Sequence, residues 1–477
     1  MWEVVGSDHY RIFIQFTKKW RNIASIFPTS KWNIKDADWQ KYSALLEEAF
    51  ANVNTNVHAR HLYDLILRNI NTVGEEVFKV KKPRQSKRKE VIRAIKAQST
   101  PRKVISSEIL SELLHKLTPN LVEHFVQDGV TQDVAHVLSE PFTDNELDIV
   151  LKDSTNSAPG MDNILYPIIK HLPISGKKIM LDMFNKKYID GEEVRELKSG
   201  IIVPIIKKSK KVEAVSDLRA VSLLSCVMKT LERIKFRLEW WLGNQGYSFA
   251  HQFGFKRSHS TITALSNLVT DIQGSFSKDK YLMAVFIDLK DAYNSVNLSI
   301  PKTNLMEVNI PATITNIVNL YTNRSLVVRS RTNNLIGPRV TSAGLAQGPV
   351  LSPLLFNIYT SDLALPNVEI IQYANDIVRY TEQNSLDLCT IILNQAMSLF
   401  QDWCNLKEFS IASNKCNVLC FTRHRSSDHI QVKLANDLFM VSNVVKYLGI
   451  WLDSKQRGGL IYLKLLKNVR RLLMFYG

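Results

Sequence analysis

Apolar residues recur with helical spacing in several parts of the chain. In segment 260–272 they fall on one face of the predicted helix. Asp36 or Asp38 is placed to cap a helix through WQKYSALLEEAF, and Pro159–Gly160 predicts a turn. Pro173 ends the pattern of a short helix before it. The predicted helices are 39–50, 104–126, 144–152, a short helix ending at His171, 223–242, 260–272 and 386–403.

Other segments have strand-like patterns. LMAVFIDL (282–289) is apolar on both faces, as expected of a strand in the middle of a sheet. In IIVPII, Pro204 predicts a position at an edge or a bulge. VEIIQY and IVRY flank the short turn at 374–376 and predict a β-hairpin. The remaining predicted strands are Tyr10–Phe16, NVLCF (417–421) and YLGIWL (447–452). These patterns predict an α+β fold, with an antiparallel element beside packed helices and no internal repeat.

The length of 477 residues indicates about three domains or one large multi-lobed enzyme. Hydrophobic residues make up 45%, too many for a disordered chain. No stretch approaches the roughly 18 apolar residues of a membrane span, and the N-terminus lacks the layout of a signal peptide. Five cysteines exclude a disulfide scaffold and favour a reducing compartment. We therefore expect an intracellular protein of the cytoplasm and nucleus, with no membrane partner.

Cys416, Cys420, His424 and His429 resemble the ligands of a zinc finger at first sight. However, only three residues separate Cys420 from His424, where a finger has a middle segment of about 12. A strand that carries two cysteines is the interpretation we favour.

The formal net charge of +16 comes from two segments. Segment 79–103 has eleven basic residues and one acid, and segment 454–477 has six basic residues and no acid. The first is interpreted as a solvated linker, a phosphate contact or a nuclear import signal, and one segment can serve all three roles. The second is predicted to form an amphipathic basic helix. Both predict salt-dependent binding to a polyanion.

Two carboxylates occupy positions where metal ligands are often found. Asp288 comes at the end of the apolar strand, and Asp376 comes at the tip of the predicted hairpin. Carboxylates at strand ends commonly hold Mg²⁺ near a sheet edge. Either residue alone is equally typical of a turn or cap, so their surroundings decide.

These surroundings form an ordered set of motifs. They are SAPGMDNI (157–164), VPIIKKSKK (203–211), LRAVSLLS (218–225), HQFGFKRSHST (251–261), FIDLKDAYNSV (286–296), GLAQGPVLSPLLFNIY (344–359), QYANDIV (372–378) and KYLGIWLD (446–453). From about Pro141 to Asp453, the chain resembles the reverse transcriptase of non-LTR retrotransposons, most closely the jockey-type elements. AQGPVLSPLLFN is the most specific segment.

The resemblance implies the fingers and palm of a right-hand polymerase, with an antiparallel palm sheet. It implies that RNA is copied into DNA with two Mg²⁺ ions, so the partners are an RNA template, an RNA–DNA hybrid and deoxynucleoside triphosphates. Two metals about 3.5–4 Å apart need a cluster of carboxylates. By the resemblance, the metal ligands are Asp288, the carbonyl of Leu289, and Asp376.

One position departs from the family pattern, which is an aromatic, any residue, then Asp-Asp. This chain has Tyr373–Ala374–Asn375–Asp376, so Asn375 occupies the place of a catalytic aspartate. An amide oxygen can coordinate Mg²⁺ but brings no negative charge. We therefore expect catalysis to be slowed about a thousandfold or more.

The resemblance assigns further roles, each with a structural alternative. Tyr293 matches the aromatic that excludes a 2′-hydroxyl, although a core aromatic is an equal interpretation. Lys415 matches the lysine that protonates pyrophosphate, unless it is simply exposed. Gln347 and Gly348 match the loop that supports the templating base pair. Residues matched to triphosphate neutralisation in the fingers are Lys207 or Lys208, and Arg219, although Ala220 replaces the expected proline.

The predicted organisation has six parts. GSDHYRIFI, in residues 1–20, looks like the last strand of the endonuclease that precedes such polymerases; Asp8 and His9 match its catalytic pair, but we expect no nuclease activity. The other parts are a helical linker region (21–78), the basic linker (79–103), a helical connector (104–140), the reverse transcriptase domain (141–453) and a basic tail in place of a full thumb (454–477).

Three functions remain open. The chain is an RNA-directed DNA polymerase of a mobile element, a catalytically inactive remnant that binds RNA or RNA–DNA hybrid, or a decayed copy. Asn375 favours the last two. A polymerase of the group II intron or telomerase type is a more distant alternative, against which KYLGIWLD argues.

Overall fold

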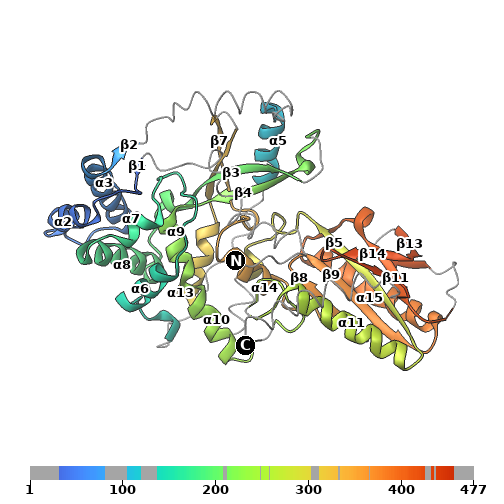
Figure 1. Ribbon diagram of the computed structural model, residues 1–477. Coiled ribbons are helices and arrows are strands. Elements are labelled where there is room, and N and C mark those ends of the chain that lie inside the picture. The colour runs from blue at the N-terminus through green and yellow to red at the C-terminus, as the bar shows by residue number, and fades with distance from the viewer. Residues whose placement is uncertain are drawn as a thin grey trace. The chain divides into compact units, whose positions relative to one another are not determined.

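The computed structural model describes residues 32–80, 105–119, 137–207, 212–247, 249–256, 258–301, 311–330, 333–364, 366–424, 431–434 and 437–455. They divide into two compact units (Figure 1). Unit 1 holds residues 246–297 and the described residues from 353 onward, and unit 2 holds residues 32–245 and 298–352. The predicted strand Tyr10–Phe16, Asp8, His9, residues 81–103 of the basic linker and residues 456–477 of the tail lie outside the described residues.

Unit 1 is built on a mixed, mainly antiparallel sheet with the strand order β12-β13-β11-β5-β9-β8. The strands are β5 (Tyr281–Lys290), β8 (Glu369–Tyr373), β9 (Asp376–Gln383), β11 (Asn417–Phe421), β12 (Gln431–Leu434) and β13 (Asp437–Ser442). A short strand, β10 (Ser410–Ile411), pairs with the end of β5. The prediction of a central strand at 282–289 is confirmed, because β5 pairs with β11 on one side and β9 on the other. The predicted hairpin is confirmed as β8–β9.

Each face of this sheet has its own cover. On one face, α11 (Thr261–Ser277) and the hairpin β14 (Val444–Tyr447)–β15 (Ile450–Asp453) share a core with alternate residues of β5, among them Phe286. On the other face, α15 (Leu386–Leu406) packs against β5, β9 and β12. The predicted helices at 260–272 and 386–403 are therefore confirmed. Ser260 and Ser385 cap their first turns through side-chain oxygens.

Unit 2 contains a second sheet, with the order β4-β3-β6-β7. Its strands are β3 (Ser199–Ile206), β4 (Leu218–Leu223), β6 (Arg324–Arg329) and β7 (Leu335–Thr341). The helix α5 (Ser107–Leu117), inside the predicted 104–126, packs its leucines against β6 and β7. β3 is an inner strand of the sheet, but at Pro204 it pairs with β4 alone, so the expectation that Pro204 lies at an edge holds locally. Pro204 is tolerated because the parallel pairing with β6 ends at Ile202.

The helices of unit 2 include a group in which α2 (Trp39–Phe50), α3 (Ala59–Val77) and α8 (Ile174–Ile189) pack together. Asp38 is the cap of α2, since its Oδ1 accepts a hydrogen bond from the backbone N–H of Lys41 at 2.9 Å. The other elements of the unit are β1 (Trp32–Asn33), β2 (Lys79–Val80), α6 (Asp144–Asp153), α7 (Tyr166–Lys170), α9 (Cys226–Leu231), α10 (Lys235–Asn244) and α13 (Ala312–Val318).

Three predictions of secondary structure were wrong or incomplete. The predicted helix 223–242 begins as strand β4 and then divides into α9 and α10 around a 3₁₀ turn at Glu232–Ile234. The predicted strand 447–452 is a hairpin, because Leu448 and Gly449 both have positive φ and form its two-residue turn. Helix α8 was missed because its buried residues surround it instead of forming one stripe.

All five cysteines are buried and free, as the sparse cysteine content predicted. Cys420 lies in β11 and Cys416 directly precedes it, which confirms the strand that we favoured there. His429 lies outside the described residues. Among the described helices, none is both long and apolar enough to cross a membrane.

Candidate active site

The two predicted carboxylates come together on neighbouring strands of unit 1. Asp288 of β5 lies directly opposite Asp376, the first residue of β9. Directly opposed residues of antiparallel strands place their side chains on one face, with Cβ atoms about 4.5–5.5 Å apart. The ladder between the two strands runs without a bulge from Tyr281↔Gln383 to Asp288↔Asp376, so the register is continuous up to the two carboxylates. The sheet therefore presents a pair of carboxylates at one end of its central strands.

The turn that joins β8 to β9 consists of Ala374 and Asn375, so Asn375 stands at the tip and Asp376 begins the strand. Ala374 has φ +58°, a conformation that an L-residue adopts only at some cost. Within the described residues, Oδ1 of Asn375 is buried and has no hydrogen-bond partner. A buried oxygen without a donor is the kind of group that a bound cation satisfies.

The donor set fits a hard divalent cation. Carboxylate, amide and backbone carbonyl oxygens are the ligands that Mg²⁺ and Ca²⁺ accept. Among the described residues, no three His, Cys, Asp or Glu side chains come together as a metal site. The negative charge next to the turn therefore comes from two carboxylates, and Asn375 adds only its amide dipole.

Lys415 lies beside the first carboxylate, as part of a segment that returns to the end of β5. Its Nζ is 2.8 Å from Oδ2 of Asp288, although about 60% of the lysine side chain remains exposed. Two backbone contacts position this segment: Ile411 pairs with Leu289, and the N–H of Ala412 donates to the carbonyl of Asp288 at 2.8 Å. The sequence placed Lys415 near the site but gave no indication of this ion pair.

Tyr293 is buried, and its ring stacks on Phe356 with 4.6 Å between centroids and 6° between planes. Phe255 approaches the same ring edge-on. Within the described residues the hydroxyl of Tyr293 has no hydrogen-bond partner, and burial raises its pKa. The ring is thus held as a core aromatic, and its predicted contact with the incoming sugar stays a prediction.

Tyr447 is a residue that sequence reasoning missed. It lies in the KYLGIWLD motif, on β14, and is buried in the core beneath the sheet. Burial raises the pKa of its phenol well above the usual value, and the charge of Asp376 raises it further. The KYLGIWLD motif therefore lies close to Asp376 in the fold, although the two are about 70 residues apart in the sequence.

The predicted fingers residues belong to unit 2. Arg219 lies on β4 opposite Ile205, and Lys207 directly follows β3, so the ladder brings both to the same end of the sheet. Nζ of Lys207 donates to the carbonyl of Ser216 at 2.7 Å. Lys208 lies outside the described residues.

The loop that contains Gln347 and Gly348 is also in unit 2. The carbonyl of Gln347 accepts a hydrogen bond from the N–H of Ser222 at 2.8 Å. Gly348 has φ +123°, and a Cβ there would meet the carbonyl oxygen of Ser222 at 2.7 Å. A close approach to the protein's own backbone is therefore one physical reason for glycine at this position.

Two buried charged residues hold the same loop, and neither was predicted. Glu232 is fully buried and accepts hydrogen bonds from the hydroxyl of Tyr321 at 2.6 Å and from the N–H of Val350 at 2.9 Å. Arg324 donates to the carbonyls of Tyr321 and Gly344, both at 2.8 Å, and to that of Ala343. A lone acid directly after the mostly apolar residues of α9 was the available signal for Glu232.

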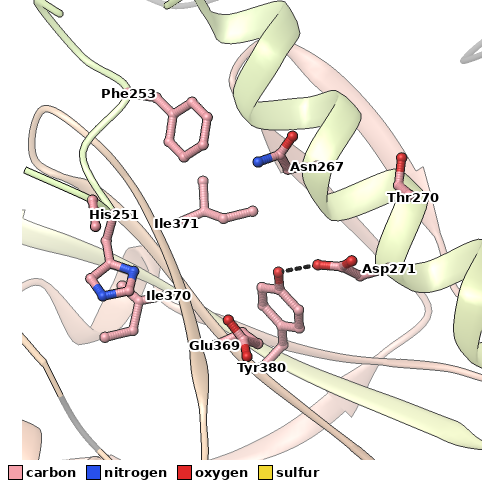
Figure 2. Close-up of a pocket in the computed structure, with 10 residues that line it drawn as sticks. His251, Phe253, Asn267, Thr270, Asp271, Glu369, Ile370, Ile371 and Tyr380 are labelled. Carbon is pink, nitrogen blue, oxygen red and sulfur yellow. Dashed lines mark hydrogen bonds between the residues drawn. The ribbon is translucent and has the colours of Figure 1, made fainter.

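A separate pocket of about 270 Å³ lies in unit 1, between α11 and the β8–β9 hairpin (Figure 2). Its polar lining includes His251, Asn267, Asp271 and Glu369, and the hydroxyl of Tyr380 donates to Asp271 at 2.5 Å. None of the predicted catalytic residues lines this pocket. The predicted catalytic carboxylates lie instead at the turn end of the hairpin, with Asp376 on β9 and Asp288 opposite it on β5.

Comparison with known proteins identifies the family of the chain. Residues 205–452 match the family "Reverse transcriptase (RNA-dependent DNA polymerase)". The chain is 30% identical over 312 residues to a protein called "Probable RNA-directed DNA polymerase from transposon BS" of Drosophila melanogaster, covering 62% of this chain and 34% of that protein. It is 29% identical over 330 residues to the X-element counterpart of the same species, covering 66% of this chain and 35% of that protein.

The "RNA-directed DNA polymerase from mobile element jockey" of Drosophila funebris is 27% identical over 331 residues, covering 66% of this chain and 35% of that protein. The chain thus spans about a third of the length of these curated relatives. A weaker similarity, to apo telomerase from Candida tropicalis, has a TM-score of 0.39 and 10% identity over 96% of this chain and 78% of that one, too low to establish a common fold. The family match and the jockey-type relatives confirm the resemblance seen in the motifs, and the chain belongs to the reverse transcriptase (RNA-dependent DNA polymerase) family.

Proposed function

We propose that this chain is built for RNA-directed DNA synthesis by nucleotidyl transfer, with its active site at Asp288 and Asp376. The observation that carries the proposal is the register of β5 and β9, which sets the two carboxylates opposite each other. The substrates would be a primer paired to an RNA template and deoxynucleoside triphosphates. In the reaction, the primer 3′-oxygen bonds to the α-phosphorus, and the bond from that phosphorus to the bridging oxygen of pyrophosphate breaks.

We assign the metal site to Asp288, Asp376, the amide oxygen of Asn375 and the carbonyl of Leu289, as a site for two Mg²⁺ ions. The orphaned Oδ1 of Asn375 supports this assignment. When bound, such ions would acidify the primer hydroxyl and neutralise the triphosphate. The chain's own part is to hold these oxygens rigidly on two strands of one sheet, so that little reorganisation is needed during reaction.

Other residues would act on the substrate directly. Lys415 would give a proton to the departing pyrophosphate, and its exposed ammonium beside Asp288 supports that role. Lys207 and Arg219 would neutralise the triphosphate from the fingers. Tyr293 would exclude a ribose 2′-hydroxyl by its bulk, and its stacking on Phe356 would restrict movement of the ring.

Asn375 would make this copy slow. A carboxylate lost from a site for two dications removes several kcal/mol of transition-state stabilisation, and roughly 4 kcal/mol corresponds to about a thousandfold in rate. Primer extension on poly(rA)–oligo(dT) with dTTP and Mg²⁺ tests this. We expect Asn375→Asp to raise the rate about a thousandfold, and a further Asp288→Asn change to abolish the gain.

A second function is favoured by Asn375 itself, namely a catalytically inactive protein that binds RNA or RNA–DNA hybrid. It would be supported if Asn375→Asp gave no extension while the wild-type chain still bound the hybrid in a filter assay. Equal extension by the wild-type chain and Asn375→Asp would instead contradict the proposed impairment.

A further inference from the structure

The segment His251–Gly254 runs beside β8 in unit 1 and reaches the turn of the hairpin. The backbone N–H of Gln372 donates to the carbonyl of His251, and the N–H of Phe253 donates to the carbonyl of Gln372, both at 2.7 Å. These two bonds form an isolated parallel bridge between Gln252 and Gln372. The bridge fixes the backbone of Gln252 beside β8, and its side chain extends from that position.

From that position Gln252 binds both backbone polar groups of Ala374. Its Oε1 accepts hydrogen bonds from the N–H of Ala374 at 2.9 Å and from the N–H of Gly254 at 2.8 Å. Its Nε2 lies 3.4 Å from the carbonyl oxygen of Ala374, as a donor. Gln252 is only 3% exposed, so its hydrogen bonds lie away from bulk solvent.

Two other residues complete the contact with the turn. Nε2 of Gln372 donates to the same carbonyl of Ala374 at 3.0 Å and to Oγ1 of Thr360 at 3.2 Å. A Cβ on Gly254 would lie 2.5 Å from the backbone nitrogen of Ala374, so only glycine permits this approach. The left-handed conformation of Ala374 is thus held by a buried polar network from a segment about 120 residues earlier in the chain.

We propose that Gln252 is a positioning residue for the candidate metal site. Asn375 and Asp376 directly follow Ala374, so any rotation of the Ala374 backbone displaces the oxygens of both. Gln252 fixes that backbone at its N–H and its carbonyl together, which a single hydrogen bond would not do. This role rests on the proposed function, because it concerns the geometry that a cation would meet.

Two measurements on the whole chain test the proposal. Gln252→Met removes the hydrogen bonds at similar volume, and Thr381→Val is the matched control, a buried β9 residue opposite Met283 whose hydroxyl accepts a hydrogen bond from Gln383. We expect site-resolved hydrogen exchange at the Ala374 amide to accelerate at least about tenfold in Gln252→Met, with the amides of β9 unchanged. We expect Mn²⁺ affinity, measured by EPR of free Mn²⁺, to fall about 10–100-fold. Thr381→Val should alter neither.

A conservative variant separates positioning from general stability. Gln252→Glu keeps an acceptor for the N–H groups of Ala374 and Gly254, so it should retain most of the amide protection and Mn²⁺ affinity. If Gln252→Met fails to fold, Gln252→Asn replaces it, since its amide is one methylene too short to reach Ala374.

If hydrogen exchange at the Ala374 amide is unchanged in Gln252→Met, or in Gln252→Asn where that replaces it, the proposed role of Gln252 is overturned. An Mn²⁺ affinity of that variant within twofold of wild type would overturn it as well. If the wild-type chain binds no Mn²⁺, the proposed function fails, and the exchange of the Ala374 amide alone then decides whether Gln252 holds the turn.

Discussion

Nζ of Lys415 lies 2.8 Å from Oδ2 of Asp288, so a cation already occupies one side of the first proposed catalytic carboxylate. A divalent ion at Asp288 must share that carboxylate with the ammonium or displace it. The lysine side chain is about 60% exposed, which leaves it free to swing into solvent or toward a bound triphosphate.

Replacement of Lys415 by Met should therefore strengthen divalent binding while leaving stability almost unchanged. An exposed ion pair contributes at most about 1 kcal/mol, and the competing positive charge disappears. We expect Mn²⁺ affinity to rise severalfold by EPR, and the midpoint of urea unfolding to stay near the wild-type value. Lys290→Met, which removes an exposed charge from the end of the same strand, is the control. Weaker Mn²⁺ binding in Lys415→Met would show that the ammonium supports the site.

Replacing each of two buried arginines by Leu should change the free energy of unfolding in opposite directions. Arg379 on β9 is fully buried, stacks on Phe400 at 4.4 Å, and has no hydrogen-bond partner for its guanidinium among the described residues. Burial lowers its pKa to about 9. We expect Arg379→Leu to raise the free energy of unfolding by about 1–4 kcal/mol.

Arg324 is the matched case, since it is equally buried but donates to three backbone carbonyls. Arg324→Leu leaves those acceptors unsatisfied and should destabilise the chain by several kcal/mol. Urea unfolding measures both variants, and destabilisation by Arg379→Leu would refute the contrast.

Lys187 of α8 gives stability a pH dependence. It is 4% exposed, and burial, followed by repulsion from Lys198, lowers its pKa to about 8. Between pH 8 and about 10.5 the unfolded chain holds a proton that the folded chain has released, so Lys187 makes stability rise with pH in that window. Lys187→Met should be more stable than wild type at pH 7, by on the order of 3 kcal/mol. The difference should shrink toward pH 10, as followed by urea unfolding; a constant difference would contradict the shift.

The carboxylate of Glu232 should couple energetically to Tyr321. Removing it leaves the hydroxyl of Tyr321 and the N–H of Val350 buried without an acceptor, at about 1–3 kcal/mol each. Tyr321→Phe removes one of those donors. We therefore expect the double variant Glu232→Leu/Tyr321→Phe to lose less stability than the sum of the single variants. Additive losses in urea unfolding would show that the two side chains do not share this bond.

The basic linker should supply most of the salt dependence of RNA binding. Replacing the eleven Lys and Arg of 79–103 by Gln preserves length and removes counterion release. The slope of log K against log salt for a single-stranded RNA should become less negative, while extension by the Asn375→Asp chain at saturating template stays the same. An unchanged slope would make the segment a solvated linker only.

The sequence predicted the parts of the site that local patterns determine. The apolar run before Asp288 and the strands around the turn at 374–375 were enough to predict a central strand and a hairpin. Their motifs predicted that Asp288 and Asp376 act together, and the register agrees.

What it did not predict depends on contacts between distant segments. Glu232 lies where the predicted helix is interrupted, and its partners, Tyr321 and Val350, lie about 90 and 120 residues away in the sequence. Nothing in the sequence distinguishes Gln252 from the other residues of its motif, because its contact with Ala374 exists only in the folded chain. Pattern and propensity contain no information about such pairs, since each partner is unremarkable in its own window.

The turn at Ala374–Asn375 also has a genetic consequence. Asparagine and aspartate have nearly the same shape, and their codons differ at a single base. The hydrogen bonds that hold the turn go to the backbone of Ala374 and not to the side chain of Asn375, so either residue at position 375 would leave them in place. One transition in the gene would therefore put a carboxylate at position 375 without changing the hydrogen bonds of the turn, so the proposed impairment would be reversible by a single base change.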